Sequence, residues 1–154
     1  MTLRDVLPED LAVFYEYNRD PESVRMAAFT VKDPDDRAAF DAYWARNLAN
    51  PEGRIRTILY EGQVAGSVLS YVMEGDTEVS YWLGRSFWGK GLASEALAAF
   101  VAETSTRPLW GRAAADNLGS IRVLEKCGFK FVKADRGFAN ARGEEIDEVV
   151  MRLD

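Results

Sequence analysis

The most informative segment of this sequence is glycine-rich: Gly84-Arg85-Ser86-Phe87-Trp88-Gly89-Lys90-Gly91-Leu92-Ala93-Ser94-Glu95-Ala96. An expected strand over Glu78–Leu83 precedes it, and an expected helix from Gly91 to about Thr104, rich in Ala and Leu, follows it. The first amides of a helix have no partner inside the helix and lie at its positive end. Because Gly89 and Gly91 let a ligand approach the backbone closely, the stretch predicts a pyrophosphate site, to which Lys90 adds a positive charge.

Two other interpretations of this stretch stay open. Gly84, Gly89 and Lys90 match most of the phosphate-binding loop of nucleotide triphosphatases, but Gly91 stands where a Ser or Thr hydroxyl holds Mg²⁺ in that loop. A Mg²⁺-dependent nucleotide-binding domain is therefore disfavoured. The turn could also do no more than reverse the chain, since glycine turns are common.

A second motif follows about two dozen residues later, from Asn117 to Phe129. Asn117 is a good helix cap and Gly128 a good stop, so a helix is expected over Leu118–Cys127. Asn117, Ser120 and Leu124 share one face of it, although an ordinary amphipathic helix would show the same pattern. We expect Cys127 to be a buried packing thiol, because the chain has no histidine to activate it.

The rest of the chain alternates between helical and strand patterns. Strands are expected at Thr2–Arg4, 54–59, Val64–Met73, Glu78–Leu83, Pro108–Ala115, Phe129–Val132 and Glu145–Leu153, and further helices at Pro8–Tyr17 and Asp36–Leu48. We expect a loop between these two helices, broken by Pro21 and Pro34. Hairpins imply antiparallel strand pairs and the strand–helix–strand segment implies a parallel one, so the sequence predicts a single α/β (α+β) domain over residues 1–154 with a mixed sheet.

Composition excludes several classes of chemistry. The 154-residue chain has no histidine and one cysteine, which removes histidine-based triads and metal sites, cysteine-based zinc sites and internal disulfides, so no metal is expected. The net charge of −6 argues against nucleic acid as a partner. Without an apolar run of about 18 residues or a secretory leader, we expect no membrane association and a cytoplasmic location.

Together the two motifs resemble the GNAT acetyltransferase superfamily. Tyr81–Leu83, Phe87–Ala96 and Asn117–Phe129 look like its RimJ/RimL branch, which acetylates protein N-termini. The resemblance implies a mostly antiparallel twisted sheet of about six to seven strands flanked by about four helices, with acetyl-CoA as co-substrate. It places the coenzyme on the residues Trp82, Leu83, Trp88, Gly89, Lys90, Gly91, Leu92, Ala93, Ser94 and Asn117.

Two residues are candidates for catalysis. Glu78 is the expected base, because no histidine is available and it shares a strand face with Ser80 and Trp82; a solvent-facing glutamate at a strand end is the alternative. Many relatives carry at the position of Leu124 a tyrosine that protonates the departing thiolate. The resemblance implies Ser120 as its substitute, and a serine that bonds only to backbone is the alternative. It also implies a bulge near Leu83, beside a backbone amide that meets the oxyanion.

The predicted function is therefore acetyl transfer from acetyl-CoA to a primary amine, on a protein N-terminus or a small molecule, by direct attack in a ternary complex. A non-catalytic module that only binds acetyl-CoA is the alternative. We expect a monomer or a homodimer.

Overall fold

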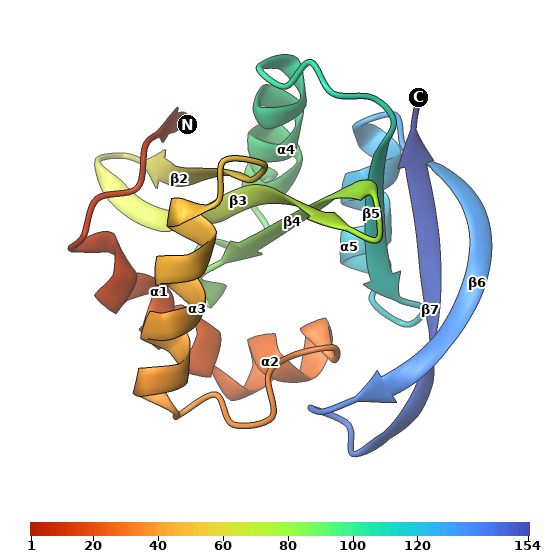
Figure 1. The fold of residues 1–154 in the computed structure, drawn as a ribbon, viewed down its shortest axis with the longest axis horizontal. Helices are drawn as coiled ribbons and strands as arrows, with labels where there is room; N and C mark the ends of the chain where they lie inside the picture. The colour runs from red at the N-terminus through yellow and green to blue at the C-terminus, as the bar shows by residue number, and fades with distance from the viewer.

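The computed structural model describes all 154 residues and is built on one seven-stranded sheet with the order β1-β2-β3-β4-β5-β7-β6 (Figure 1). The strands are β1 (Thr2–Arg4), β2 (Arg54–Tyr60), β3 (Gln63–Met73), β4 (Asp76–Leu83), β5 (Leu109–Ala114), β6 (Lys130–Ala139) and β7 (Glu144–Leu153). Only β4 and β5 run parallel, and every other neighbouring pair is antiparallel. The predicted mixed, mostly antiparallel sheet is confirmed.

Five α-helices flank this sheet. They are α1 (Asp10–Arg19), α2 (Pro21–Ala27), α3 (Arg37–Ala49), α4 (Leu92–Ala102) and α5 (Leu118–Lys126), and a short 3-10 helix, η1 (Arg85–Phe87), precedes α4. The four predicted helices are all present. The loop expected between the first two was wrong over α2, since Asp20 caps this helix by accepting a hydrogen bond from the Ser23 amide at 3.0 Å. Pro21 therefore begins a helix, at a position where proline is well tolerated.

Strand β6 is also longer than predicted. It was expected to end at Val132 but continues to Ala139, paired with β7 along its length. Most of its residues are exposed, because β6 is the edge of the sheet. Main-chain pairing with β7 forms this strand, and an edge strand does not need an apolar alternation that a sequence would reveal.

The two faces of the sheet pack against different helices. On one face α4 and α5 cover the main core, in which Leu97, Phe100 and Leu124 are buried (Figure 1). On the other face, Phe14 of α1 stacks on Trp44 of α3 with ring centroids 5.0 Å apart. Burial of each such side chain contributes about 1.5–3 kcal/mol. Strands β3 and β4 therefore pack between the two helical layers.

Strands β4 and β5 diverge after a short parallel contact. They pair only from Thr77 to Val79, after which β4 continues beside β3 alone and β5 beside β7 alone. The register between β3 and β4 is continuous from Asp76 to Leu83, so the bulge expected near Leu83 does not appear in this pairing. Early termination of the β4–β5 ladder opens the sheet, and strand twist widens the gap.

Candidate active site

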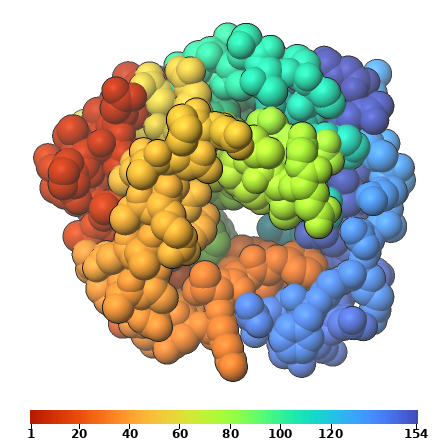
Figure 2. Space-filling view, in the orientation of Figure 1, coloured from red at the N-terminus to blue at the C-terminus, as the bar shows by residue number.

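A cavity of about 590 Å³ opens where β4 and β5 diverge. Its walls come from Val79–Leu83 of β4, the glycine-rich turn, α2, α5 and the facing ends of β5 and β7. Figure 2 shows an opening that passes through the molecule between the β3–β4 hairpin, α2 and the two C-terminal strands. The cavity therefore connects the glycine-rich turn with the sheet face that carries Glu78.

The glycine-rich turn has the backbone that the sequence predicts. Gly89 and Gly91 have φ angles of +77° and +74°, and left-handed Gly91 caps the N-terminus of α4. Such angles favour glycine. The turn lines the cavity with Gly89, Gly91, Leu92, Ala93 and Ser94, whereas exposed Lys90 is not among the lining residues. The amides that begin α4 thus border the cavity.

Trp88 fixes this turn to the sheet. Its indole N–H donates to the carbonyl of Leu83 at 3.3 Å, and the ring lines the cavity while 40% of the residue stays exposed. The contact joins the end of β4 to the start of the turn.

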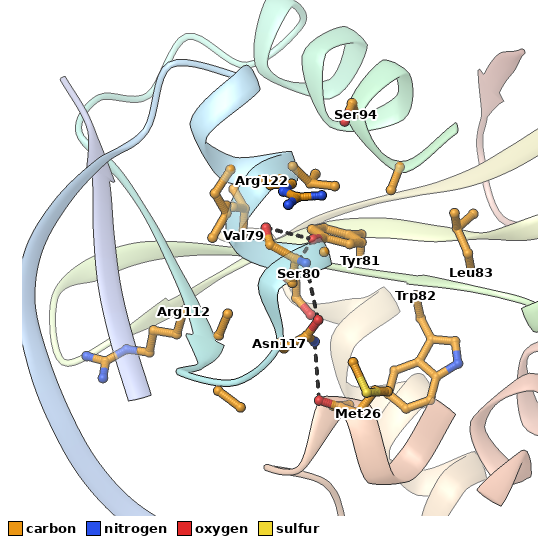
Figure 3. A pocket seen from close by; sticks show the side chains of 18 of the residues that line it. Met26, Val79, Ser80, Tyr81, Trp82, Leu83, Ser94, Arg112, Asn117 and Arg122 are labelled. Atoms are coloured by element: carbon orange, nitrogen blue, oxygen red, sulfur yellow. Dashed lines mark hydrogen bonds between the residues drawn. The ribbon is translucent and has the colours of Figure 1, made fainter. Parts of the chain in front are cut away.

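Sequence reasoning missed two cations on α5. Arg122 and Lys126 line the same cavity and lie one helical turn apart. Figure 3 shows Arg122 on the side of α5 that faces Ser94 of α4. The i,i+4 spacing on a helix already assigned to the site is the signal that could have identified them. The electrostatics of this end favour an anion.

Ser120 meets a partner that sequence reasoning also missed. The Ser120 hydroxyl lies 2.6 Å from the phenol oxygen of Tyr81, and either group can donate the proton (Figure 3). Burial raises the pKa of Tyr81 to about 12, so the phenol stays protonated at neutral pH. Ser120 therefore bonds to a side chain, contrary to the alternative of backbone bonding alone.

Asn117 serves as the predicted helix cap and adds a second contact. Its Oδ1 accepts a hydrogen bond from the Ser120 amide at 3.2 Å, and its Nδ2 donates to the Met26 carbonyl of α2 at 3.2 Å (Figure 3). The side chain joins α5 to α2 across the cavity and fixes the backbone that carries Ser120.

Leu124 and Trp82 both line the cavity, but each is held by contacts elsewhere in the fold. Leu124 is buried and packs on Gly111 of β5, so this position of α5 faces the core. The Trp82 indole donates to the Tyr17 carbonyl of α1 at 3.1 Å, beside Met26 (Figure 3). Its ring forms the wall between the cavity and the N-terminal helices.

Glu78 is buried, with only 3% of its side chain exposed, so it is not a solvent-facing glutamate. Its Oε1 accepts a hydrogen bond from Nε of Arg112 at 3.2 Å, while Oε2 has no partner. Burial raises the pKa of the Glu78 carboxyl, and the positive charge of Arg112 opposes the shift without cancelling it. A buried carboxylate with an elevated pKa and a free oxygen suits proton transfer.

Asp10 is a buried carboxylate of a different kind. Arg4, the Leu7 amide and the Thr57 hydroxyl all donate to it, at 2.6 to 2.9 Å. Burial acts to raise its pKa, but these hydrogen bonds outweigh burial and hold the pKa below the usual value. Asp10 is therefore a structural carboxylate, and of these two buried carboxylates only Glu78 has an oxygen available for proton transfer.

Arg112 gathers carboxylates from three strands. Besides Glu78 of β4, its Nη1 contacts Glu148 of β7 at 3.1 Å and Asp135 of β6 at 3.5 Å. Glu78, Arg112 and Glu148 all line the cavity.

Cys127 packs against the core but is half-buried, not buried as predicted. Its thiol donates to the Ser94 carbonyl at 3.4 Å, and burial raises its pKa, which keeps it protonated. No helix here combines the length and apolar character that a membrane crossing requires.

Comparison with known proteins gives a consistent result. A sequence model described as an acetyltransferase (GNAT) domain matches residues 1–130. A relative from Bacillus licheniformis, named uncharacterized N-acetyltransferase p20, is 28% identical over 164 aligned residues, covering 99% of this chain and 92% of the relative.

Two solved structures share the fold. RimL, a ribosomal L7/L12 alpha-N-protein acetyltransferase in complex with coenzyme A, superposes with a TM-score of 0.82 at 16% identity, over 98% of this chain and 92% of RimL. A phosphinothricin acetyltransferase from Sinorhizobium meliloti, in complex with acetyl-CoA, gives a TM-score of 0.81 at 21% identity, over 99% and 86% of the two chains. The chain belongs to the GNAT acetyltransferase family and is an acyltransferase.

Proposed function

We propose that this protein transfers the acetyl group of acetyl-CoA to a primary amine by direct attack in a ternary complex. One observation carries the proposal: a single cavity has the N-terminus of α4, with its free backbone amides, at one end and a buried carboxylate, Glu78, at the other. The acetyl-CoA and coenzyme A bound by the two solved relatives support the choice of coenzyme.

The coenzyme pyrophosphate would bind at the glycine-rich turn. Backbone amides from Gly89 to Ala93 would donate to its oxygens, and Arg122 and Lys126 would balance its charge. Lys90, exposed at the turn, would act on the phosphates from outside the cavity.

The acyl end of the coenzyme would lie along the open edge of β4. The Gly84 amide donates to the carbonyl of Ala65 in β3, and amides alternate in direction along a strand. The amides of Tyr81 and Leu83 therefore face the gap left by β5. They are the donors we assign to the coenzyme and to the oxyanion that forms as the amine attacks the thioester carbon.

Glu78 would remove the proton that an alkylammonium carries at neutral pH. Its unpartnered Oε2 accepts that proton directly or through a water molecule, and the neutral amine then attacks. The proton acceptor lies within the cavity, so the amine and the thioester can be held together in one complex.

Ser120 would donate a hydrogen bond to the departing thiolate. A thiol with a pKa near 8.5 is a good leaving group and needs only a modest donor. Tyr81 would orient the Ser120 hydroxyl through the 2.6 Å contact, as a positioning residue.

The acceptor amine is the finer part of the proposal. Protein N-termini, as in the RimJ/RimL branch, and small-molecule amines both fit a cavity with an open mouth. The similarity to RimL supports a shared fold and does not choose between these acceptors. A panel of amines with acetyl-CoA, read by thiol release and by mass analysis of the product, tests the proposal. Acetyl-CoA binding without thiol release for any amine would instead identify a non-catalytic module.

A further inference from the structure

The acceptor end of the cavity is built around one guanidinium and an excess of carboxylates. Arg112 contacts Glu78, Glu148 and Asp135 at 3.2, 3.1 and 3.5 Å. These carboxylates come from β4, β7 and β6, so the sheet itself assembles the cluster. Glu78 and Glu148 line the cavity with Arg112, and these two carboxylates beside one guanidinium leave this end of the cavity negatively charged.

Burial makes this excess charge effective. The Glu78 and Glu148 side chains are only 3% and 15% exposed, so solvent screens them weakly. Each uses Oε1 on Arg112, and Oε2 of each has no partner in the protein. Two carboxylate oxygens are thus available to receive hydrogen bonds from a cation.

The same cluster opposes a carboxylate on the acceptor. Nε and Nη1 of Arg112 are occupied, and a carboxylate that reached Nη2 would lie among three others. The walls of the cavity include the apolar side chains of Met26, Phe29 and Trp82, and Tyr71 of β3 lies beside Glu78. An ammonium group attached to an apolar body complements both parts of this surface.

We infer that the acceptor is a primary amine with an apolar body and no carboxylate beside its amino group, and that Glu148 selects for it. The inference rests on the proposed acetyl transfer. Glu78 would handle the proton, whereas Glu148 would contribute to recognition of the cation through its charge.

Three acceptors with the same aromatic body test this selectivity. Phenethylamine lacks the carboxylate, phenylalanine carries it, and phenylalaninamide carries a neutral group of similar size. We expect kcat/KM for phenethylamine to exceed that for phenylalanine at least tenfold, with phenylalaninamide close to phenethylamine. Equal values for phenethylamine and phenylalanine would overturn the inference.

Glu148→Gln tests the assigned residue. It should raise KM for phenethylamine and narrow the advantage of phenethylamine over phenylalanine severalfold. Because the charge of Glu148 helps to raise the pKa of Glu78, the acidic limb of the pH–rate profile should move to lower pH. Glu145→Gln, on the same strand but 66% exposed, is the matched control and should leave the advantage unchanged. An unchanged advantage in Glu148→Gln would refute the role of Glu148.

Binding separates this inference from the proposed function. Calorimetry on the enzyme saturated with CoA measures affinity for the same acceptors without transfer. Absence of transfer to every amine would overturn the proposed function. Affinity for phenylalanine equal to that for phenethylamine would overturn the inference, whether or not transfer occurs.

Discussion

Replacing Glu78 with glutamine keeps the shape of the side chain and removes the buried carboxylate that faces the cavity. An alkylamine with a pKa of about 10.4 is neutral in only about one molecule in 2,500 at pH 7. Without a base the enzyme would depend on that fraction, so kcat/KM at pH 7 should fall by roughly two to three orders of magnitude. The deficit should shrink about tenfold per pH unit, since the amine then deprotonates itself.

The assay is thiol release from acetyl-CoA from about pH 4 to 10, with coenzyme affinity measured by calorimetry. In the unmodified enzyme, activity should fall on acidification through the pKa of Glu78, which burial raises above the usual glutamate value. Glu52→Gln, at an exposed loop position, is the control and should behave as the parent. A Glu78→Gln enzyme with the parent pH–rate profile would show that the base lies elsewhere.

Three further predictions follow from the same structure. Gly91→Glu should weaken acetyl-CoA binding at least tenfold in calorimetry, which corresponds to about 1.4 kcal/mol. The loss should exceed that in Gly91→Ala, a control that strains the backbone without adding charge. Ser120→Ala should lower kcat more than it raises KM, and Tyr81→Phe should lower kcat less than Ser120→Ala does. The double variant should have the kcat of Ser120→Ala alone; additive losses of kcat would refute the positioning role of Tyr81. Asp10→Asn should lower the unfolding free energy by about 3 kcal/mol in urea titrations, because Arg4 loses its buried partner but is itself partly exposed. Since the folded pKa of Asp10 is depressed, its stabilising effect should be present above the unfolded pKa and lost as pH falls through the folded one.

Local signals in the sequence predicted the parts of the fold that depend on local physics. Gly89 and Gly91 need left-handed angles, and the Ala- and Leu-rich segment after them is helical. Pro21 was misinterpreted, because proline interrupts a helix in its interior but suits its first turn, and the Asp20 cap decides between the two.

The missed parts of the candidate site depend on contacts between distant segments. Tyr81 meets Ser120 from 39 positions away, and Arg112 reaches Glu78 across 34. Those contacts arise because β4 and β5 are parallel neighbours that separate after Val79, and no periodicity within either strand encodes that separation. Burial of Glu78 likewise follows from the assembled sheet.

Direct transfer within a ternary complex is tested most directly by the intact mass of the protein after incubation with acetyl-CoA, first without and then with phenethylamine. We predict an unmodified chain in both cases, no thiol release without the amine, and one acetylated amine per thiol released with it. A chain heavier by one acetyl group before amine is added, and restored once amine is added, would contradict the account, because the acetyl group would then pass through the protein.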